Sequence, residues 1–398
     1  MPWKVSRAMD TKMEFISRLN SGERMTDLCR EYGIARKTGH KLQKRFAVGG
    51  VAALAEHSRA PRHVPHKTSA EVAELVTTAR REHPGWGPKK LKDVLEKRLQ
   101  SSLPSSSTIG TILVRAGLVE PRRRRPRHAS PSSHRSEALA PNDLWCIDYK
   151  GQFRLGDRSL CYPLTLTDQM SRYILACDGM AAISDAAAQD ACQEVFRHHG
   201  LPNAMRSDNG APFASVGLAG LTCLSVYWLR LGIRLERSRP AHPEDNGRHE
   251  RMHRTLKRET TRPARRNLLQ QQERFDEFVE EFNQERPHEA LGMQRPAEVY
   301  RSSSRTYPAT LPEPTYPTHD DVLTVRRNGF LSLPGRGELY LAKALHGQQV
   351  GVREEDDGRW LVTFMTMDLG HVERDRTFTE TTQFPRGDLL KVLPMFPV

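Results

Sequence analysis

The sequence has no long run of apolar residues. A membrane-spanning helix needs about 18 apolar residues in succession, and no stretch of the 398 residues approaches that length. The first ten residues contain no apolar signal core either. These absences argue against a membrane protein and against secretion, so we expect a cytoplasmic protein with no membrane partner.

Paired cysteines are also missing. No two of the six cysteines form a C-x-x-C pair; they are Cys29, Cys146, Cys161, Cys177, Cys192 and Cys223. We expect reduced thiols that pack as small hydrophobic side chains. Apolar residues make up only 37% of the chain, which predicts a polar surface around several moderate cores.

Negative charge is scarce in the first third of the chain. Residues 1–140 contain 28 Lys and Arg against 13 Asp and Glu, whereas residues 141–398 contain 33 against 35. The net charge of +13 therefore resides in the N-terminal region. Lys and Arg bind phosphates with release of counterions, so the charge favours a DNA-binding arm joined to a near-neutral body. A basic surface without a specific partner is the alternative.

Residues 1–66 are predicted to form a helix-turn-helix domain. Three short helices are expected within residues 10–50, with Gly33 breaking the chain before the third. A helix, a tight turn with Gly and a second, basic helix are typical of this motif. The basic residues predicted to contact DNA are Arg36, Lys37, Lys41, Lys44 and Arg45.

Residues 67–120 are predicted to form a second all-α unit of similar kind. A helix ending at Glu82, a turn at residues 83–88, a Lys-rich helix near residues 89–99 and a further helix after Pro104 are expected. This pattern favours a second helix-turn-helix over a helical spacer.

Two segments cannot build a core and are predicted to be linkers. Residues 121–141 begin with five arginines in seven residues, and residues 301–319 are rich in Pro. The arginines predicted to track phosphates are Arg122, Arg123, Arg124 and Arg125.

The linkers enclose a mixed α/β domain at residues 142–300. Its first half contains short strand-like runs and its second half contains long helical segments, which predicts a mixed sheet flanked by helices. Residues 320–398 contain short β-rich runs separated by turns such as residues 356–358. This pattern predicts a small β-barrel at the C-terminus.

Three acidic residues of the α/β domain have unusual surroundings. Asp148 is predicted to lie within a strand, where Asp is disfavoured; Asp208 opens a turn directly after a strand, and Glu250 lies in the first turns of a helix. A carboxylate within a sheet needs a partner or a cation. Three converging carboxylates would hold two hard divalent cations, which can assist phosphodiester cleavage.

The sequence around these residues resembles the DDE transposases of bacterial insertion sequences, which share their core with retroviral integrases. The motifs are Leu-Trp-Cys-Ile-Asp-Tyr-Lys-Gly at 144–151, Arg-Ser-Asp-Asn-Gly at 206–210, His-Pro-Glu-Asp-Asn-Gly-Arg-His-Glu-Arg at 242–251 and Asn-Gln-Glu-Arg-Pro-His at 283–288. The resemblance implies an RNase H-like core and divalent metal, Mg²⁺ or Mn²⁺, with two ions expected. It assigns the three carboxylate roles, catalytic and metal-binding, to Asp148, Asp208 and Glu250.

The chain departs from this family in two respects. Residues 209–249 put 41 positions between the second and third carboxylates, somewhat more than is usual, and an insertion near residues 214–228 would explain the excess. No zinc-binding His/Cys arm precedes the core, and helix-turn-helix units occupy that place. This difference favours the bacterial transposase branch.

The segment from His249 to His253 also fits H-E-x-x-H, a zinc peptidase motif. On a helix both histidines would share a face and could bind zinc. The next turn is strongly basic, however, and we expect Arg254 and Lys257 to contact DNA. The peptidase interpretation also leaves Asp148, Asp208 and the basic N-terminal region unexplained. The histidines themselves are expected to touch DNA or to be plain surface residues.

The leading prediction is a polynucleotidyl transferase that cleaves DNA at the ends of a mobile element and joins them to target DNA. Its partners would be double-stranded DNA, at terminal inverted repeats and target sites, and further copies of itself on that DNA. We would expect such a protein at the bacterial nucleoid. The alternative is a DNA-binding regulator with an inactive core.

Overall fold

The computed structural model describes residues 8–55, 68–119, 138–238 and 246–381, except residues 336, 356, 357 and 376. These residues fall into two compact units, divided between Thr68 and Ser69. Among them, none of the helices has the length and apolar character to cross a membrane.

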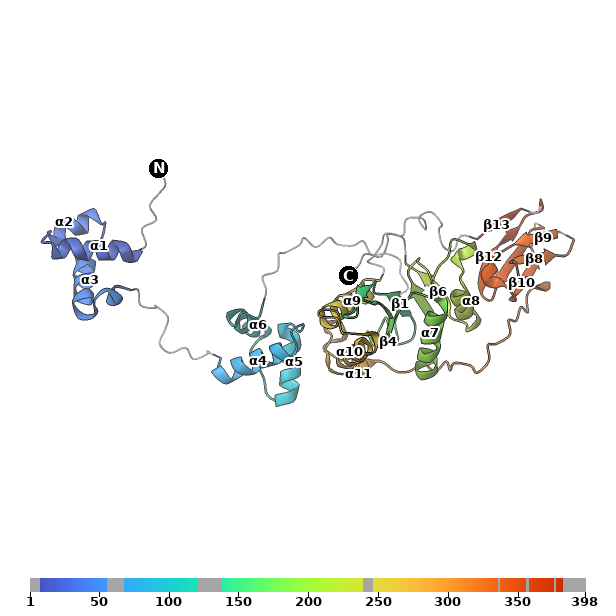
Figure 1. Ribbon diagram of the computed structural model, residues 1–398, viewed down its shortest axis with the longest axis horizontal. Helices are drawn as coiled ribbons and strands as arrows, with labels where there is room; N and C mark the ends of the chain where they lie inside the picture. The colour runs from blue at the N-terminus through green and yellow to red at the C-terminus, as the bar shows by residue number, and fades with distance from the viewer. Residues whose placement is uncertain are drawn as a thin grey trace. The chain divides into compact units, whose positions relative to one another are not determined.

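The first unit is a small helical domain, as predicted (Figure 1). It consists of α1 (Ala8–Asn20), α2 (Met25–Glu31), α3 (Arg36–Gly49) and the short turn η1 (Val51–Leu54). Gly33 has φ +64° between α2 and α3, a conformation that glycine adopts without strain. The helices pack around a buried core of Phe15, Ile16, Leu28, Cys29, Leu42 and Leu54.

The second unit begins with another three-helix arrangement, formed by α4 (Ala70–Glu82), α5 (Pro88–Leu99) and α6 (Ser106–Arg115). The hydroxyls of Ser69 and Ser105 accept hydrogen bonds from the first turns of α4 and α6, and such caps fix where a helix starts. The shared core contains Val76, Trp86, Leu91, Leu95, Ile109 and Leu113. This packing favours a folded domain over an extended helical spacer.

A mixed sheet forms the centre of the α/β domain. Its strands are β1 (Trp145–Tyr149), β2 (Phe153–Arg154), β3 (Leu160–Asp168), β4 (Ile174–Met180), β5 (Ala204–Ser207) and β6 (Arg234–Arg237). β3 pairs antiparallel with β1, β2 and β4, whereas β5 pairs parallel with β1 and β6. β1 therefore lies inside the sheet, between β3 and β5.

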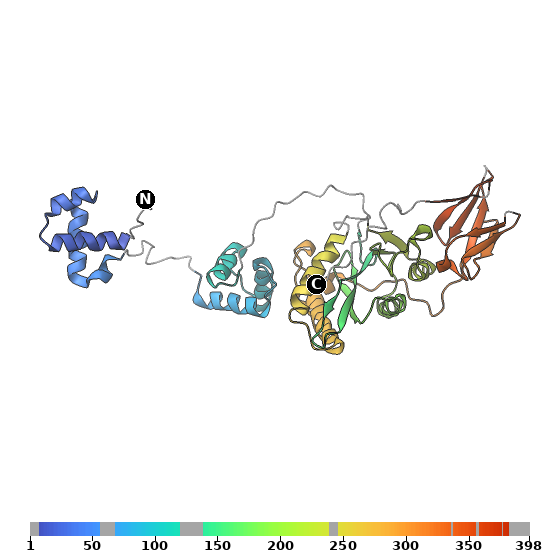
Figure 2. The ribbon, with the colours of Figure 1, turned by 45° about the horizontal axis from the view of Figure 1, so that its top comes forward.

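Helices cover both faces of this sheet (Figure 1, Figure 2). On one face, α7 (Asp185–His199) and α8 (Cys223–Arg230) pack through residues such as Phe196 and Trp228. On the other, α9 (Gly247–Thr260) and α10 (Leu268–Glu280) contribute Met252, Leu256 and Phe275. The chain then passes through η4 (Glu281–Glu285), η5 (Glu289–Leu291) and α11 (Pro296–Val299). The resulting α/β/α layers agree with the predicted core.

The C-terminal region is β-rich, as expected. An antiparallel sheet runs in the order β13-β12-β11-β10-β7, and β8 pairs with β9 in a separate hairpin. The strands are β7 (Asp321–Thr324), β8 (Phe330–Leu333), β9 (Gly337–Tyr340), β10 (Gln349–Glu354), β11 (Trp360–Phe364), β12 (Met367–Val372) and β13 (Phe378–Glu380), with η6 (Lys343–Leu345) before β10. Among the described residues the edge strands β7 and β13 are not paired with each other. The barrel therefore stays a prediction.

This C-terminal sheet shares its hydrophobic core with part of the central domain. The residues contributed by the central domain come from η2 (Leu218–Gly220) and α8, and they are Leu218, Ala219, Leu221, Val226 and Leu229. They pack with Val350, Val362, Phe364 and Leu369 of the sheet. The segment predicted as an insertion thus overlaps the residues that hold the C-terminal sheet.

Candidate metal-binding carboxylate site

Asp148 lies on β1 and faces α9. Side chains alternate between the faces of a strand, and Trp145, Ile147 and Tyr149 belong to the apolar cluster on the α7 side. Asp148 therefore points to the opposite face, where its side chain keeps 23% of its exposure. A half-buried carboxylate in an inner strand is costly unless it is compensated.

The sheet register brings Asp208 beside Asp148. Trp145 pairs with Met205 and Cys146 with Arg206 in the parallel β1–β5 ladder. Continuing that register past the end of β5 puts Asp208 level with Asp148, on strands that lie about 5 Å apart. The Asp208 carboxylate accepts a hydrogen bond from the backbone N–H of Gly210 at 3.2 Å, which holds the turn after β5.

Glu250 completes the acidic group from the first turn of α9. Burial raises the pKa of Asp148 well above its usual range, and the charges of Asp208 and Glu250 raise it further, against a lowering by Lys150. Burial also raises the pKa of Asp208. The charges of Asp208 and Glu250 thus act on Asp148, and a metal site shared by the three carboxylates stays a prediction.

Two cations of the site were not predicted from the sequence. Lys150 follows Asp148 by two positions, a spacing that puts both side chains on the same face of the sheet. Burial lowers the pKa of Lys150, whereas Asp148 and Glu250 raise it. Arg237 at the end of β6 is partly buried, with a pKa of about 10 that burial lowers and Asp208 raises. It donates hydrogen bonds to Ser207 Oγ and to the carbonyl of Gly220. The i, i+2 spacing from Asp148 could have indicated Lys150, but nothing local indicated Arg237.

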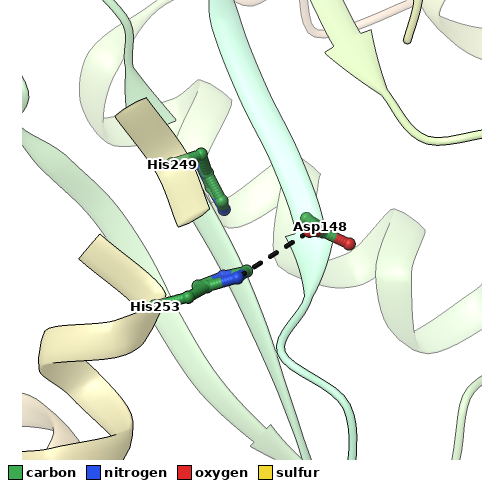
Figure 3. A group of neighbouring side chains, drawn as sticks. All are labelled: Asp148, His249 and His253. Carbon is green, nitrogen blue, oxygen red and sulfur yellow. Dashed lines mark ion pairs between the residues drawn. The ribbon is translucent and has the colours of Figure 1, made fainter. Parts of the chain in front are cut away.

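Two histidines of α9 lie directly against Asp148 (Figure 3). His253 Nδ1 is 3.8 Å from Asp148 Oδ2, and ligand atoms of Asp148, His249 and His253 all lie within 4.8 Å of one another. The Thr165 hydroxyl contacts Nε2 of His249 at 2.8 Å and Nε2 of His253 at 2.6 Å, and donates to the Asp148 carbonyl. Nδ1 of His249 is 2.7 Å from the Thr167 hydroxyl.

This arrangement corrects the expectation for the histidines. His249 and His253 are 2% and 5% exposed, so they are neither surface residues nor available to DNA. Burial lowers the pKa of His249 to about 3 and lowers that of His253 well below its usual range, so both rings are neutral at pH 7. Both ring nitrogens of His249 are already hydrogen-bonded, which makes His249 a poor zinc ligand.

The hydrogen bonds also indicate which nitrogens carry protons. When the Thr165 hydroxyl gives its only proton to the Asp148 carbonyl, it accepts an N–H from each histidine. The Nε2 of each neutral ring is then protonated, and Nδ1 of His253 is an acceptor that faces a carboxylate oxygen. These two acceptors, Nδ1 of His253 and the carboxylate oxygen of Asp148, would both be stabilised by a cation between or beside them.

The predicted DNA-contacting residues have different environments. On α3, Arg36, Lys37, Lys41 and Lys44 are exposed. Arg45 is partly buried and donates to the Ala55 carbonyl of its own domain, and its expected contact with DNA stays a prediction. On α9, Arg254 and Lys257 lie one and two turns after Glu250, and Arg254 is exposed whereas Lys257 is partly buried.

The arginine-rich segment lies outside the described residues. Arg122, Arg123, Arg124 and Arg125 fall within 120–137, and residues 242–245 of the third motif fall within 239–245, both undescribed. Their expected roles stay predictions.

Comparison with protein families gives matches for the central domain and for the helical regions. Models described as integrase core domain match residues 138–243 and residues 231–296. A homeodomain-like domain model matches residues 38–113, which include α4, α5 and most of α3 and α6.

Curated relatives include proteins of two bacterial insertion elements. An uncharacterized 39.2 kDa protein of insertion element IS476 from Xanthomonas euvesicatoria is 26% identical over 66% of this chain and 72% of its own length. An uncharacterized 31.7 kDa protein of insertion element IS407 from Burkholderia multivorans is 25% identical over 63% of this chain and 87% of its own. The Gag-Pol polyprotein of baboon endogenous virus is 27% identical over 44% of this chain, which spans only 10% of that polyprotein.

Solved structures of lower similarity belong to retroviral integrases. The HTLV-2 integrase catalytic core domain in complex with magnesium is 14% identical, with a TM-score of 0.34 over 42% of this chain and 100% of that one. A simian T-cell lymphotropic virus intasome in complex with PP2A regulatory subunit B56 gamma is 16% identical, with a TM-score of 0.38 over 75% of this chain and 97% of that one.

Proposed function

We propose that this chain, an integrase core protein homologous to insertion-element proteins and to retroviral integrase cores, is an active DDE transposase. It cleaves DNA at the ends of its element and transfers those ends into target DNA. The observation that supports the proposal is the β1–β5 register, which puts Asp208 level with Asp148; the charge of Glu250 on α9 also raises the pKa of Asp148.

The donor set fits a hard divalent cation. Carboxylate oxygens are the ligands that Mg²⁺ and Mn²⁺ prefer. Burial and, to a smaller degree, the charges of Asp208 and Glu250 raise the pKa of Asp148, and a bound cation would offset both effects. Asp148, Asp208 and Glu250 would hold the metal, with two ions expected. Bound metal would supply Lewis-acid activation of the attacking oxygen and stabilisation of the leaving oxygen.

The chain's own residues supply the remaining functions. Water attacks a phosphodiester at each element end and releases a 3′-hydroxyl, which then attacks the target DNA. Arg254 and Lys257 are on the flank of α9 that carries Glu250, where their charges attract DNA phosphates. The exposed basic residues of α3 bind the DNA duplex outside the core domain. Several copies of the protein act together on DNA at the nucleoid. The C-terminal sheet closes as a small β-barrel.

Substitution of the carboxylates tests this function. Asp148→Asn, Asp208→Asn and Glu250→Gln should each lower Mg²⁺-dependent cleavage of a duplex carrying the DNA that borders the gene by roughly a thousandfold or more. Asp190→Asn is the control, because it makes the same chemical change at an exposed position of α7. Mn²⁺ binding followed by electron paramagnetic resonance should weaken with each site variant. Substantial cleavage by Asp148→Asn would remove Asp148 from the site.

One observation favours a second arrangement, because Asp148, His249 and His253 offer ligand atoms within 4.8 Å of one another. A zinc peptidase site would require these histidines to bind metal. Elemental analysis separates the peptidase from the transposase. One zinc per wild-type chain, lost in both His249→Ala and His253→Ala, would overturn the transposase role of Glu250.

A further inference from the structure

A second basic region lies on the other flank of α9. With about 3.6 residues per turn, Glu250, Arg254 and Lys257 share one side of the exposed surface of α9, while Arg248 and Arg251 lie on the other side. That other side borders a cavity of about 580 Å³. The cations that line it are Lys90, Arg172, Arg248, Arg251, Arg258 and Arg286. Asp148, Asp208 and Glu250 do not line this cavity, and its six cations outnumber its two carboxylates, Asp168 and Glu289.

Three of these cations, Arg172, Arg248 and Arg251, form what we call the arginine corner. None of them forms an ion pair within the described part of the chain, although Arg248 donates to the carbonyl of Gln169 at 3.3 Å. Arg258 and Arg286 differ from them, because both pair with Glu259. The arginine corner thus has charge that the described residues leave uncompensated.

Neither carboxylate that lines the cavity forms an ion pair with the corner among the described residues, and Glu289 pairs with Lys89 instead. Asp168 also lines the cavity, but its oxygens accept hydrogen bonds from the backbone N–H and hydroxyl of Ser171 and from the backbone N–H of Asn142. It is 1% exposed. Asp168 therefore serves to hold the turn between β3 and β4.

Arg172 occupies a costly position in that turn. Its φ is +67°, a left-handed conformation in which glycine is favoured over residues with a side chain. Its Nε is buried, with no hydrogen-bond partner in the described residues. Burial and the charges of Arg248 and Arg251 together lower its pKa to about 10, although Asp168 acts in the opposite direction. A desolvated guanidinium at a strained position, beside two like charges, is suited to an anionic ligand.

We propose that the arginine corner binds the sugar–phosphate backbone of the DNA whose reacting phosphodiester lies at the carboxylates on the opposite flank of α9. Guanidinium groups bind phosphate oxygens through paired N–H donors. A ligand with several phosphates can pair with all three guanidinium groups, whereas a small ligand with a single carboxylate cannot. A helix is about 10–12 Å across with its side chains, so a strand that crosses α9 can contact both flanks. This inference rests on the proposed function and adds a second backbone contact to it.

Salt-dependent binding by the full chain tests the proposal. Arg172→Gly, Arg248→Gln, Arg251→Gln and the triple variant would be titrated with a 30-bp duplex in EDTA at several salt concentrations; the length is of about three helical turns. Each substitution should reduce the slope of log affinity against log salt by about one. We expect the triple variant to bind at least about tenfold more weakly.

The variants include their own folding controls. Arg172→Gly relieves the positive φ, so it should unfold at the same temperature as the wild type or higher. Arg234→Gln removes an exposed arginine at the start of β6, at the end of the sheet away from Asp208, and should leave the slope unchanged. An unchanged slope in the triple variant, or an equal loss in Arg234→Gln, would overturn the proposal.

Two further measurements distinguish a DNA backbone from a small anion as the ligand, and the corner from the catalytic function. If pyrophosphate raises the melting temperature of the wild type but not of the triple variant, while both bind DNA equally, the corner is a small-anion site and the proposal is wrong. Because binding is measured without metal, Asp148→Asn should retain the arginine-dependent slope. A wild type that binds DNA through the corner but never cleaves it would refute the proposed function and leave the corner's role intact.

Discussion

The two faces of α9 both carry basic residue types, but those on one face are buried and neutral whereas those on the other are exposed. On the buried face, His249 and His253 are neutral and hydrogen-bonded to threonines of β3. On the exposed face, Arg248, Arg251 and Arg254 keep their charge in or near solvent. The comparison shows that a basic helix sequence does not by itself define a DNA-binding surface, because burial decides which residues remain cations.

The largest contrast in stability between the two faces should come from Leu256. Its side chain is fully buried between the sheet and α10, so Leu256→Ala should destabilise the fold by about 2–5 kcal/mol through the cavity it leaves. Urea denaturation of the full chain, followed by a signal from the core, measures the loss. A change below about 0.5 kcal/mol, the size expected at a surface, would show that this face does not pack against the sheet.

The pH dependence of stability should come from the buried face. The pKa of His249 falls to about 3 on folding, from about 6.5 in the unfolded chain. Its neutral ring therefore contributes stability that is fully present above pH about 6.5 and is lost as pH falls toward the folded value. Between pH 7.5 and pH 5, the wild type should lose about 2 kcal/mol more than His249→Gln does.

The variant comparison in that experiment is needed because Asp148 acts in the opposite direction. Its raised pKa makes protonation stabilising, so this contribution grows as pH falls. Parallel curves for the wild type and His249→Gln would show that the ring of His249 is not held neutral by burial.

Loss of one hydroxyl should have a smaller effect. Thr165→Val keeps the shape of the side chain but removes the group that bonds to His249, His253 and the Asp148 carbonyl. The unfolding free energy should fall by about 1–3 kcal/mol, since buried polar groups lose their partner. Thr255→Val, on the exposed half of α9, is the matched control. Equal effects from both substitutions would contradict the buried network.

The smallest effect should come from the exposed face. Arg251→Gln should change the unfolding free energy by no more than about 0.5 kcal/mol, at pH 5 and at pH 8 alike, because its side chain is exposed and forms no ion pair within the described part of the chain. Urea titrations at the two pH values check this. A stability loss of more than about 1 kcal/mol would mean that Arg251 supports the fold and would weaken its proposed role at the arginine corner.

Local pattern was sufficient to predict the elements that carry the site. Apolar alternation in 144–149 predicts β1 and therefore the face on which Asp148 lies, and the turn after Ser207 predicts the end of β5. Local pattern offers Asp148, Asp208 and Glu250 only as candidates, and it is the family resemblance that assigns them the three carboxylate roles, which stay a prediction. The parallel β1–β5 pairing puts Asp208 level with Asp148, and no local pattern shows that pairing.

Long-range packing determined what could not be predicted. The states of His249 and His253 depend on Thr165 and Thr167, which lie more than 80 positions earlier in the chain. Arg237 reaches the site through contacts with Ser207 and the Gly220 carbonyl. The H-E-x-x-H pattern was misleading for the same reason, since the sequence places both histidines on one face of a helix but does not show what that face contacts.

The shared core between η2, α8 and the C-terminal sheet has a consequence for how the chain can be divided. Leu218, Leu221, Val226 and Leu229 are buried in one core with side chains of residues 325–372. A fragment that stopped at residue 300 would expose these side chains to water as a contiguous apolar patch, of the kind that promotes aggregation. The residues of η2 and α8, between Asp208 and Glu250, thus join the central domain to the C-terminal sheet through a shared core. The two parts would have to be expressed together in one chain.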